Sequence, residues 1–330
     1  MTRRSAPNSK LTRPAKNAAG QLARPENRAP GLPAPFPYFG GKQRIAASIV
    51  DLLPVHELYL EPYFGSGSLL LAKQPSAVEI VNDLDGALAT FWRILREQSA
   101  QLERLCRLTP HSRTELQLAR QTVTDMGANE IYSESKTRSE REMGSDASPV
   151  VDLEIARCVF VQLTQGRGAT LGGNTGWRHY RSGFSMAKAL QGYADRLAPI
   201  ASRLAEVSIE CRDAIDIITD FGADPKALIV ADPPYPLNAR SVKHSGGRYH
   251  QEADQEHHHR LAEALHIIAG KAIVFTYPNP LYDALYGSWE RVDIPATKQS
   301  AQQATEVAYL NYEPPCEPSL LDYLPGDGHE

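Results

Sequence analysis

Segments with the pattern of strands and segments with the pattern of helices alternate along this chain in two separate blocks. A helix that connects two strands returns the chain to the same end of the sheet, so successive strands lie parallel. The sequence therefore predicts an α/β fold, with a mostly parallel sheet covered by helices on both faces. The expected strands are Leu58–Glu61, Val78–Val81, Val207–Glu210, Ala227–Ala231 and Ala272–Thr276, and the expected helices are Ile45–Leu53, Ala87–Arg96, Ala214–Thr219, His257–Ala269, Leu281–Tyr286 and one that begins at Ser68–Lys73.

A long stretch without this alternation separates the two blocks. With 330 residues and roughly 150 residues per domain, the chain has room for two domains. We expect one α/β domain split into residues 34–100 and 201–313, with residues 101–200 inserted as a second, mainly helical and loop domain. Residues 124–149 of the insert are polar and aperiodic, which predicts a long mobile loop. Residues 314–330 are expected to form a Pro-rich C-terminal tail.

Charge is unevenly distributed along the chain. The 35 Lys and Arg against 39 Asp and Glu give a net charge of −4, which by itself argues against a nucleic-acid partner. Residues 1–33, however, carry seven Lys or Arg, one acid and five prolines, and this composition predicts a disordered basic tail. Such a tail is either a solvated segment or an arm that attracts phosphates. Residues 155–194 carry five Lys or Arg and no acid, so a second basic region lies in the insert.

This acid-free stretch contains a glycine-rich segment, Gln165–Arg181, in which Trp177, His179 and Tyr180 are interleaved with arginines. Two interpretations stay open, a solvated basic surface and a surface that faces DNA. Trp177 and Tyr180 either probe bases or pack the loop. The candidate DNA contacts are Arg167, Arg178, Arg181 and Lys188.

Other residue patterns limit the chemistry and the compartment. The four cysteines are far apart, so neither a disulfide framework nor a zinc site is expected. The run His257–His259 predicts a solvated helix start with one histidine turned inward rather than a metal site. No apolar run is long enough to span a bilayer and the first residues lack an apolar signal core, so we expect a cytoplasmic protein.

The strongest chemical signal is Asp232-Pro233-Pro234-Tyr235, which directly follows the apolar strand Ala227–Ala231. Ligands of open α/β sheets bind just beyond the carboxyl ends of the strands. The two prolines lack N–H groups, so the segment presents hydrogen-bond acceptors on a rigid backbone. It suits a substrate amino group, which brings two donors, and Tyr235 offers a flat ring for stacking a base. A Pro-rich turn with a buried tyrosine is the alternative.

A glycine loop supplies a second signal. The sequence Glu61-Pro62-Tyr63-Phe64-Gly65-Ser66-Gly67 follows an expected strand, and its glycines allow close backbone approach to a ligand. No Lys-Ser or Lys-Thr pair follows Gly67, which disfavours an ATPase phosphate loop. Asp83 follows the next strand, where an acid can accept hydrogen bonds from ribose hydroxyls.

In this order the motifs resemble those of Dam-type DNA adenine-N6 methyltransferases. The resemblance covers roughly residues 36–100 and 205–313 and is weak over the insert. The residues that carry it are Tyr38-Phe39-Gly40-Gly41-Lys42, Glu61–Gly67, Asn82-Asp83 and Asp232–Tyr235, followed by Arg248-Tyr249, His257-His258 and Glu306–Tyr312.

The resemblance implies a Rossmann-like catalytic domain that uses S-adenosylmethionine as methyl donor and needs no metal. It places the target recognition domain in the insert, where the acid-free basic stretch lies. Double-stranded DNA is the implied partner, and a cognate restriction endonuclease stays open as another. The residues implied at the donor are Tyr38, Gly41, Lys42, Phe64, Gly65, Gly67, Asp83, Asp213 and Asp232. Of these, Asp213 is expected near the amino group of the donor's own adenine.

The expected reaction is methyl transfer to the N6 amino group of an adenine swung out of the DNA stack. Asp232 and the Pro233 carbonyl would accept the amino hydrogens, and Tyr235 would stack on the base. Related motifs also serve methylation of cytosine N4, of RNA adenine or of a glutamine amide in protein, so these substrates stay open. A catalytically silent DNA-binding module is the alternative from another class.

Overall fold

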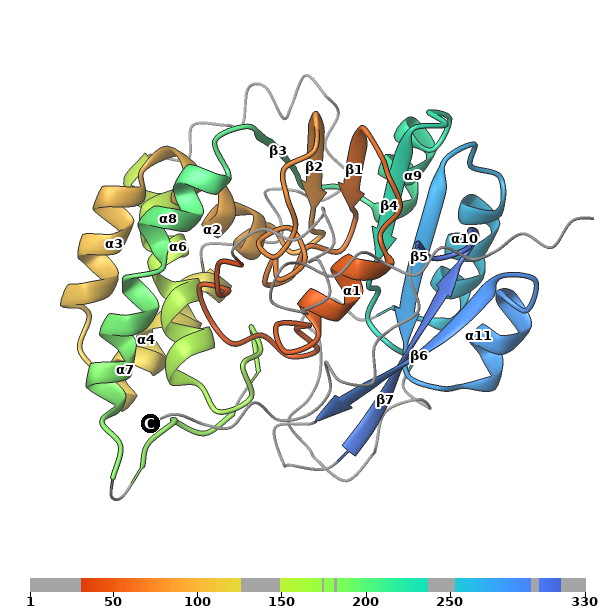
Figure 1. Ribbon diagram of the computed structural model, residues 1–330. Coiled ribbons are helices and arrows are strands. Elements are labelled where there is room, and N and C mark those ends of the chain that lie inside the picture. The colour runs from red at the N-terminus through yellow and green to blue at the C-terminus, as the bar shows by residue number, and fades with distance from the viewer. Residues whose placement is uncertain are drawn as a thin grey trace, which may run out of the picture.

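Figure 1 shows a computed structural model of the chain, which describes residues 31–125, 149–173, 175–180, 183–236, 253–297 and 303–315. A seven-stranded sheet has the order β3-β2-β1-β4-β5-β7-β6. Strands β1 to β5 pair in parallel, whereas β7 is antiparallel to both β5 and β6. The predicted α/β class with a mostly parallel sheet is therefore confirmed. The strands are β1 (Leu58–Glu61), β2 (Val78–Asn82), β3 (Val207–Glu210), β4 (Ala227–Ala231), β5 (Lys271–Thr276), β6 (Glu290–Thr297) and β7 (Gln303–Leu310).

Both faces of the sheet are covered. Alternate residues of each strand point to opposite faces, and both sets are buried in hydrophobic clusters. In β4, Leu228 and Val230 belong to one hydrophobic cluster, whereas Ile229 and Ala231 belong to another. The helices that cover the first face include α1 (Ala46–Leu52) and α2 (Gly86–Glu97), and those that cover the second are α9 (Ala214–Phe221), α10 (Gln255–His266) and α11 (Pro280–Leu285).

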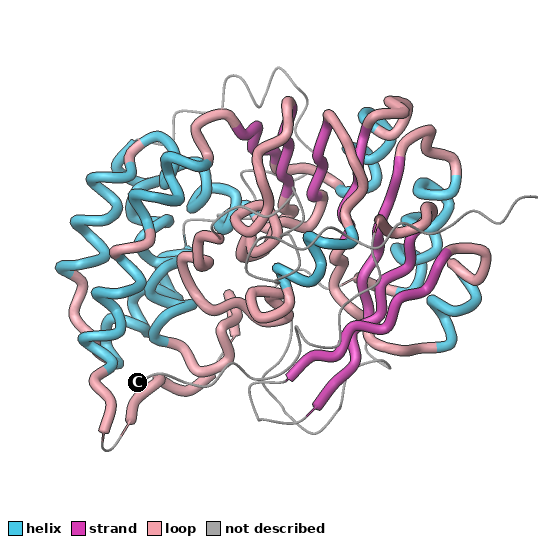
Figure 2. Tube along the Cα trace, viewed as in Figure 1, coloured by secondary structure: helices cyan, strands magenta, loops and turns pink. Residues whose placement is uncertain are grey.

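The segment between the two halves of the sheet domain forms helices joined by loops (Figure 2). These helices gather at one side of the molecule, next to α2 (Figure 1). Helix α6 packs against α2, α3 and α4, and its buried residues share a hydrophobic cluster with α2. The insert is thereby built onto the helical layer of the sheet. Its helices are α3 (Ser99–Leu108), α4 (Arg113–Asp125), α6 (Pro149–Gln165), α7 (Met186–Ala194) and α8 (Leu197–Arg203).

A buried ion-pair network fixes the end of the insert to the sheet. Arg203 of α8 donates to both carboxylate oxygens of Glu79 in β2, at 2.5 and 2.8 Å. The ammonium of Lys73, whose side chain is 2% exposed, lies 2.5 Å from the same carboxylate. Buried charges need such pairing to offset their desolvation. The network sets the position of α8 against β2.

Two expected helices differ from those observed. The helix expected to begin at Ser68–Lys73 is a short run of turns. Pro75 follows closely and disfavours helical backbone at Gln74, so a longer helix cannot continue from these turns. Helix α10 begins two residues earlier than expected, since the Asp254 side chain caps it by accepting from the His257 N–H.

Several expectations concern residues outside the described ranges. These are the basic tail up to residue 30, residues 126–148 of the expected mobile loop, the tail from residue 316 and Arg248-Tyr249. The described flanks of the loop are helical, because α4 reaches Asp125 and α6 begins at Pro149.

Candidate functional site

A cavity of about 360 Å³ opens at the carboxyl ends of β1, β2 and β4. Its walls come from the loop before α1, the loop after β1, the segments after β2 and β4, and the first turns of α10. This is the edge at which open α/β sheets bind ligands. The predicted site residues that line the cavity are Tyr38, Gly41, Lys42, Phe64, Gly65, Asp83 and Asp232.

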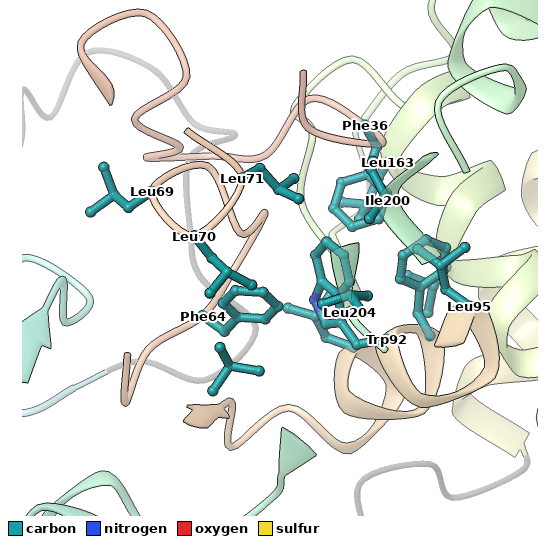
Figure 3. Packing of buried hydrophobic residues seen from close by; sticks show 14 of the residues in the cluster. Phe36, Phe64, Leu69, Leu70, Leu71, Trp92, Leu95, Leu163, Ile200 and Leu204 are labelled. Carbon is teal, nitrogen blue, oxygen red and sulfur yellow. The ribbon is translucent and has the colours of Figure 1, made fainter. Parts of the chain in front are cut away.

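The loop after β1 is held in a conformation that requires glycine. Gly65 and Gly67 have φ angles of 49° and 66°, in the left-handed region that other residues rarely adopt. A Cβ atom on Gly67 would lie 2.8 Å from the ring of Phe64. Trp92 of α2 donates through Nε1 to the Gly65 carbonyl at 3.1 Å, and its ring packs 4.7 Å from that of Phe64 (Figure 3). The loop therefore presents its backbone to the cavity on a rigid aromatic support.

Asp83 joins this loop to the end of β2. Its carboxylate accepts the Gly65 N–H at 2.8 Å and the Asp85 N–H at 3.0 Å. Asp85 in turn caps α2. Burial, together with the charge of Asp85, raises the pKa of Asp83 to about 7, although the two backbone hydrogen bonds oppose the shift. Asp83 thus titrates near neutrality and can accept hydroxyl hydrogens once ionised.

Lys42 connects the loop before α1 with the segment after β4. Its ammonium donates to Asp232 Oδ1 at 2.7 Å and to the Tyr235 hydroxyl at 2.5 Å. Burial alone lowers the pKa of Lys42, but the charges of Asp232 and Glu306 outweigh it, so the pKa lies above its usual value. Lys42 is therefore a cation that pairs with Asp232.

One oxygen of Asp232 stays available to a ligand. The side chain is 20% exposed and lines the cavity. Its Oδ1 is bound by Lys42, whereas Oδ2 has no hydrogen bond within the part of the chain that the structure describes. A carboxylate oxygen in this position accepts hydrogen bonds from an incoming donor group.

Tyr235 is buried, at 2% exposure, and its ring meets that of Tyr277 edge to face at a centroid distance of 4.9 Å. Its hydroxyl donates to Glu306 Oε2 in β7 at 2.6 Å. The alternative of a Pro-rich turn with a buried tyrosine thus describes its present surroundings, and stacking on a base stays a prediction.

Some expected site residues lie outside the cavity wall. Gly67 forms the turn behind it, and Pro233 is buried beside Asp232. Asp213 caps α9 by accepting the Ile215 N–H at 2.7 Å. Its expected contact with a donor adenine stays a prediction.

Glu61 lines the cavity at the end of β1, although the sequence had pointed to it only as the first residue of the glycine-loop motif and not as a site residue. It accepts a hydrogen bond from the buried Tyr59 hydroxyl at 2.8 Å. Burial and the charge of Asp232 raise the pKa of Glu61 to about 8, even though the bond from Tyr59 lowers it. The sequence feature that could have identified Glu61 is an acidic residue at the end of an apolar strand. Burying a carboxylate there is costly unless it has a partner or a function.

The first turns of α10 were missed as well. Asp254, Glu256, His257 and Arg260 line the cavity. His257 Nε2 lies 2.7 Å from the Tyr63 hydroxyl, which connects α10 to the glycine loop. The next histidine, His258, is 1% exposed and bonds Tyr282, so one residue of the histidine run does turn inward.

The basic stretch of the insert separates into paired and unpaired charges. Arg157 is bound by Glu115 and Glu154. Arg167 and Lys188 are exposed and Arg178 is half-buried, and none of these three contacts a carboxylate among the described residues. Arg181 lies outside the described ranges.

The glycine-rich segment reaches the cavity through its backbone. The Phe39 N–H, in a cavity-lining residue, donates to the Ala169 carbonyl at 2.9 Å. Arg167 lies two residues before this contact. The basic surface of the insert therefore begins beside the cavity.

The structure distinguishes the two aromatic candidates of this segment. The ring of Trp177 is stacked against those of His111 and His179, at centroid distances of 4.2 and 5.3 Å, so it packs the loop. Tyr180, by contrast, is 57% exposed and contacts the exposed Phe184.

Among the helices of the described ranges, none is both long and apolar enough to cross a bilayer. Nor do three or more His, Cys, Asp or Glu gather there as a metal site would require.

Residues 38–299 match the sequence profile of a protein family described as D12 class N6 adenine-specific DNA methyltransferase. The match spans most of the chain and includes every residue that lines the cavity. A search of curated proteins finds no match.

Proposed function

The chain belongs to the D12 class of N6 adenine-specific DNA methyltransferases, and on this premise we propose that S-adenosylmethionine is its methyl donor and an adenine flipped out of duplex DNA its target. The observation that carries the proposal is the state of Asp232. Lys42 holds one of its oxygens, and the other faces the cavity that the glycine loop and Asp83 also line.

The two ends of the cavity suit the two substrates. At one end, Asp83 and the backbone of Gly65 offer an acceptor and a close-packed turn to the ribose of the donor. At the other end, Asp232 offers an acceptor to one N–H of the adenine amino group, and the Pro233 carbonyl, which lies outside the cavity wall here, is proposed to accept the other. Tyr38 and Lys42 also line the cavity and complete the proposed donor contacts.

The donor supplies a methyl group on a positively charged sulfur, which leaves as a neutral thioether while the N6–methyl bond forms. Asp232 and Pro233 turn the amino hydrogens toward themselves, so the nitrogen lone pair leaves conjugation and points at the methyl group. Their fixed acceptors stabilise the positive charge that develops on nitrogen. The partly exposed Asp232 then passes the surplus proton to water.

Tyr235 remains the proposed stacking partner of the base. Its hydroxyl is held by Lys42 and Glu306, and the ring lies edge to face with that of Tyr277. Because the ring is 2% exposed here, entry of the base must uncover it.

Residues 101–200 are proposed to read the DNA. Arg167, Arg178 and Lys188, together with Arg181, would neutralise phosphates next to the cavity, since no described acid pairs with the first three. This explains how a chain of net charge −4 holds a polyanion.

The first test is Asp232→Asn. We expect methyl transfer to duplex DNA to fall about 100- to 1,000-fold, because the amide offers no negative charge to the developing cation. Donor binding, measured by calorimetry, should change far less. Asp220→Asn, at an exposed residue of α9, is the matched control and should behave as wild type. Mass spectrometry of the digested DNA should show N6-methyladenine; N4-methylcytosine alone would contradict the proposed substrate.

The second test uses the pKa of Asp83. Because ribose hydroxyls favour the carboxylate, donor affinity should rise about tenfold between pH 6 and pH 8, as a group of pKa about 7 ionises. In Asp83→Asn this tenfold pH dependence of donor affinity should disappear. At each pH, the ratio of the donor dissociation constants of the variant and the wild type isolates the contribution of Asp83. An equal pH dependence in both proteins would remove Asp83 from the donor site.

The third test concerns the basic surface. Arg167→Gln, Arg178→Gln and Lys188→Gln should each reduce the log–log salt slope of DNA binding by about 0.9. Lys226 precedes β4, at the amino ends of the strands and away from the cavity, and it pairs with Glu57. Lys226→Gln should therefore leave the slope unchanged. If all three insert substitutions also leave it unchanged, DNA binds another face.

A further inference from the structure

Glu306 is a carboxylate on an otherwise apolar face of β7. The residues that share its face, Ala308 and Leu310, are buried in the hydrophobic cluster, whereas Glu306 is 7% exposed. Burying a carboxylate is costly unless hydrogen bonds and opposite charge compensate it. Its partners therefore account for its presence there.

Those partners are the residues proposed to carry the chemistry. Tyr235 donates its hydroxyl hydrogen to Glu306 Oε2 at 2.6 Å. The same hydroxyl oxygen accepts a hydrogen bond from Lys42, whose ammonium also holds Asp232 at 2.7 Å. The Lys42 ammonium lies 3.8 Å from Glu306 Oε2. A continuous chain of hydrogen bonds thus runs from Glu306 through Tyr235 and Lys42 to Asp232.

The direction of each bond in this chain is set by its donors. Lys42 has no acceptor, so it must donate to Tyr235 and to Asp232. A tyrosine hydroxyl has one hydrogen, and with Lys42 occupying a lone pair this hydrogen must go to another acceptor. Glu306 is that acceptor, and a carboxylate accepts more strongly than a neutral group.

The second carboxylate also helps to place Lys42. The Lys42 ammonium lies 2.7 Å from Asp232 Oδ1 and 3.8 Å from Glu306 Oε2, so oxygens from two distant segments hold it where it binds Asp232.

We propose that Glu306 is a positioning residue for methyl transfer: by taking the hydroxyl hydrogen of Tyr235 it fixes Tyr235 and, through Lys42, the carboxylate of Asp232. The inference rests on the proposed roles of Asp232 and Tyr235. Glu306 itself touches neither substrate.

The test compares Glu306→Ala and Glu306→Gln in single-turnover methylation of duplex DNA. The alanine variant should be about 30-fold slower, because it leaves Tyr235 without its acceptor. The glutamine variant, which still accepts from the hydroxyl through a neutral oxygen, should recover to within about threefold of wild type. The dissociation constant of the donor should change by less than about threefold in both.

A double variant separates positioning from a merely structural role. In Tyr235→Phe the hydroxyl is gone, so adding Glu306→Ala should slow the reaction by less than about threefold more. Asp283→Ala removes the carboxylate that accepts from Tyr309, another tyrosine of β7, at 2.6 Å. This matched control should lower the melting temperature without changing the single-turnover rate.

Two results would overturn the inference while the proposed function stands. One is a Glu306→Ala rate within about threefold of wild type. The other is a full 30-fold loss from Glu306→Ala in the Tyr235→Phe background, which would show that Glu306 acts independently of the hydroxyl. Absence of methyl transfer by the wild-type protein would instead overturn the proposed function, and this inference with it.

Discussion

The ion pair between the buried Lys42 and the partly exposed Asp232 joins the two parts of the site. Lys42 precedes the first helix and Asp232 follows the fourth strand, 190 residues later, yet their charged atoms lie 2.7 Å apart. An ammonium that is 2% exposed is tolerated only with such partners. The pair fixes the loop before α1 against the Asp-Pro-Pro-Tyr segment, and the Asp232 side chain also lines the cavity.

The parallel sheet supplies the frame on which this pair depends. Strands β1, β2 and β4 end at one edge, so Glu61, Asp83 and Asp232 reach the same cavity. Trp92 supports the glycine loop through its hydrogen bond to the Gly65 carbonyl. The insert packs on the same helical layer, and the Ala169 carbonyl of its glycine-rich segment accepts the N–H of Phe39 in the cavity wall.

The features that the sequence predicted correctly are those that depend on the local pattern of residues. The strands of the parallel sheet follow from apolar periodicity, and motif position at their carboxyl ends gave seven of the residues that line the cavity. Contacts between distant segments were not predictable in this way. The bond of Tyr235 to Glu306 spans 71 residues, and the turn of α10 into the cavity depends on how helices pack. The helix expected from Ser68–Lys73 was wrong, although the nearby Pro75 is a local signal against a longer helix there.

A crystal structure with a non-reactive analogue of S-adenosylmethionine is the most direct test of the central claim, that this cavity holds the donor with its methyl group facing Asp232. The claim predicts ribose hydroxyls within hydrogen-bond distance of Asp83, the amino-acid portion beside Tyr38 and Lys42, and the position of the transferred methyl group on the side of Asp232 Oδ2. An analogue bound elsewhere, or bound here with its ribose at Asp232, would contradict it.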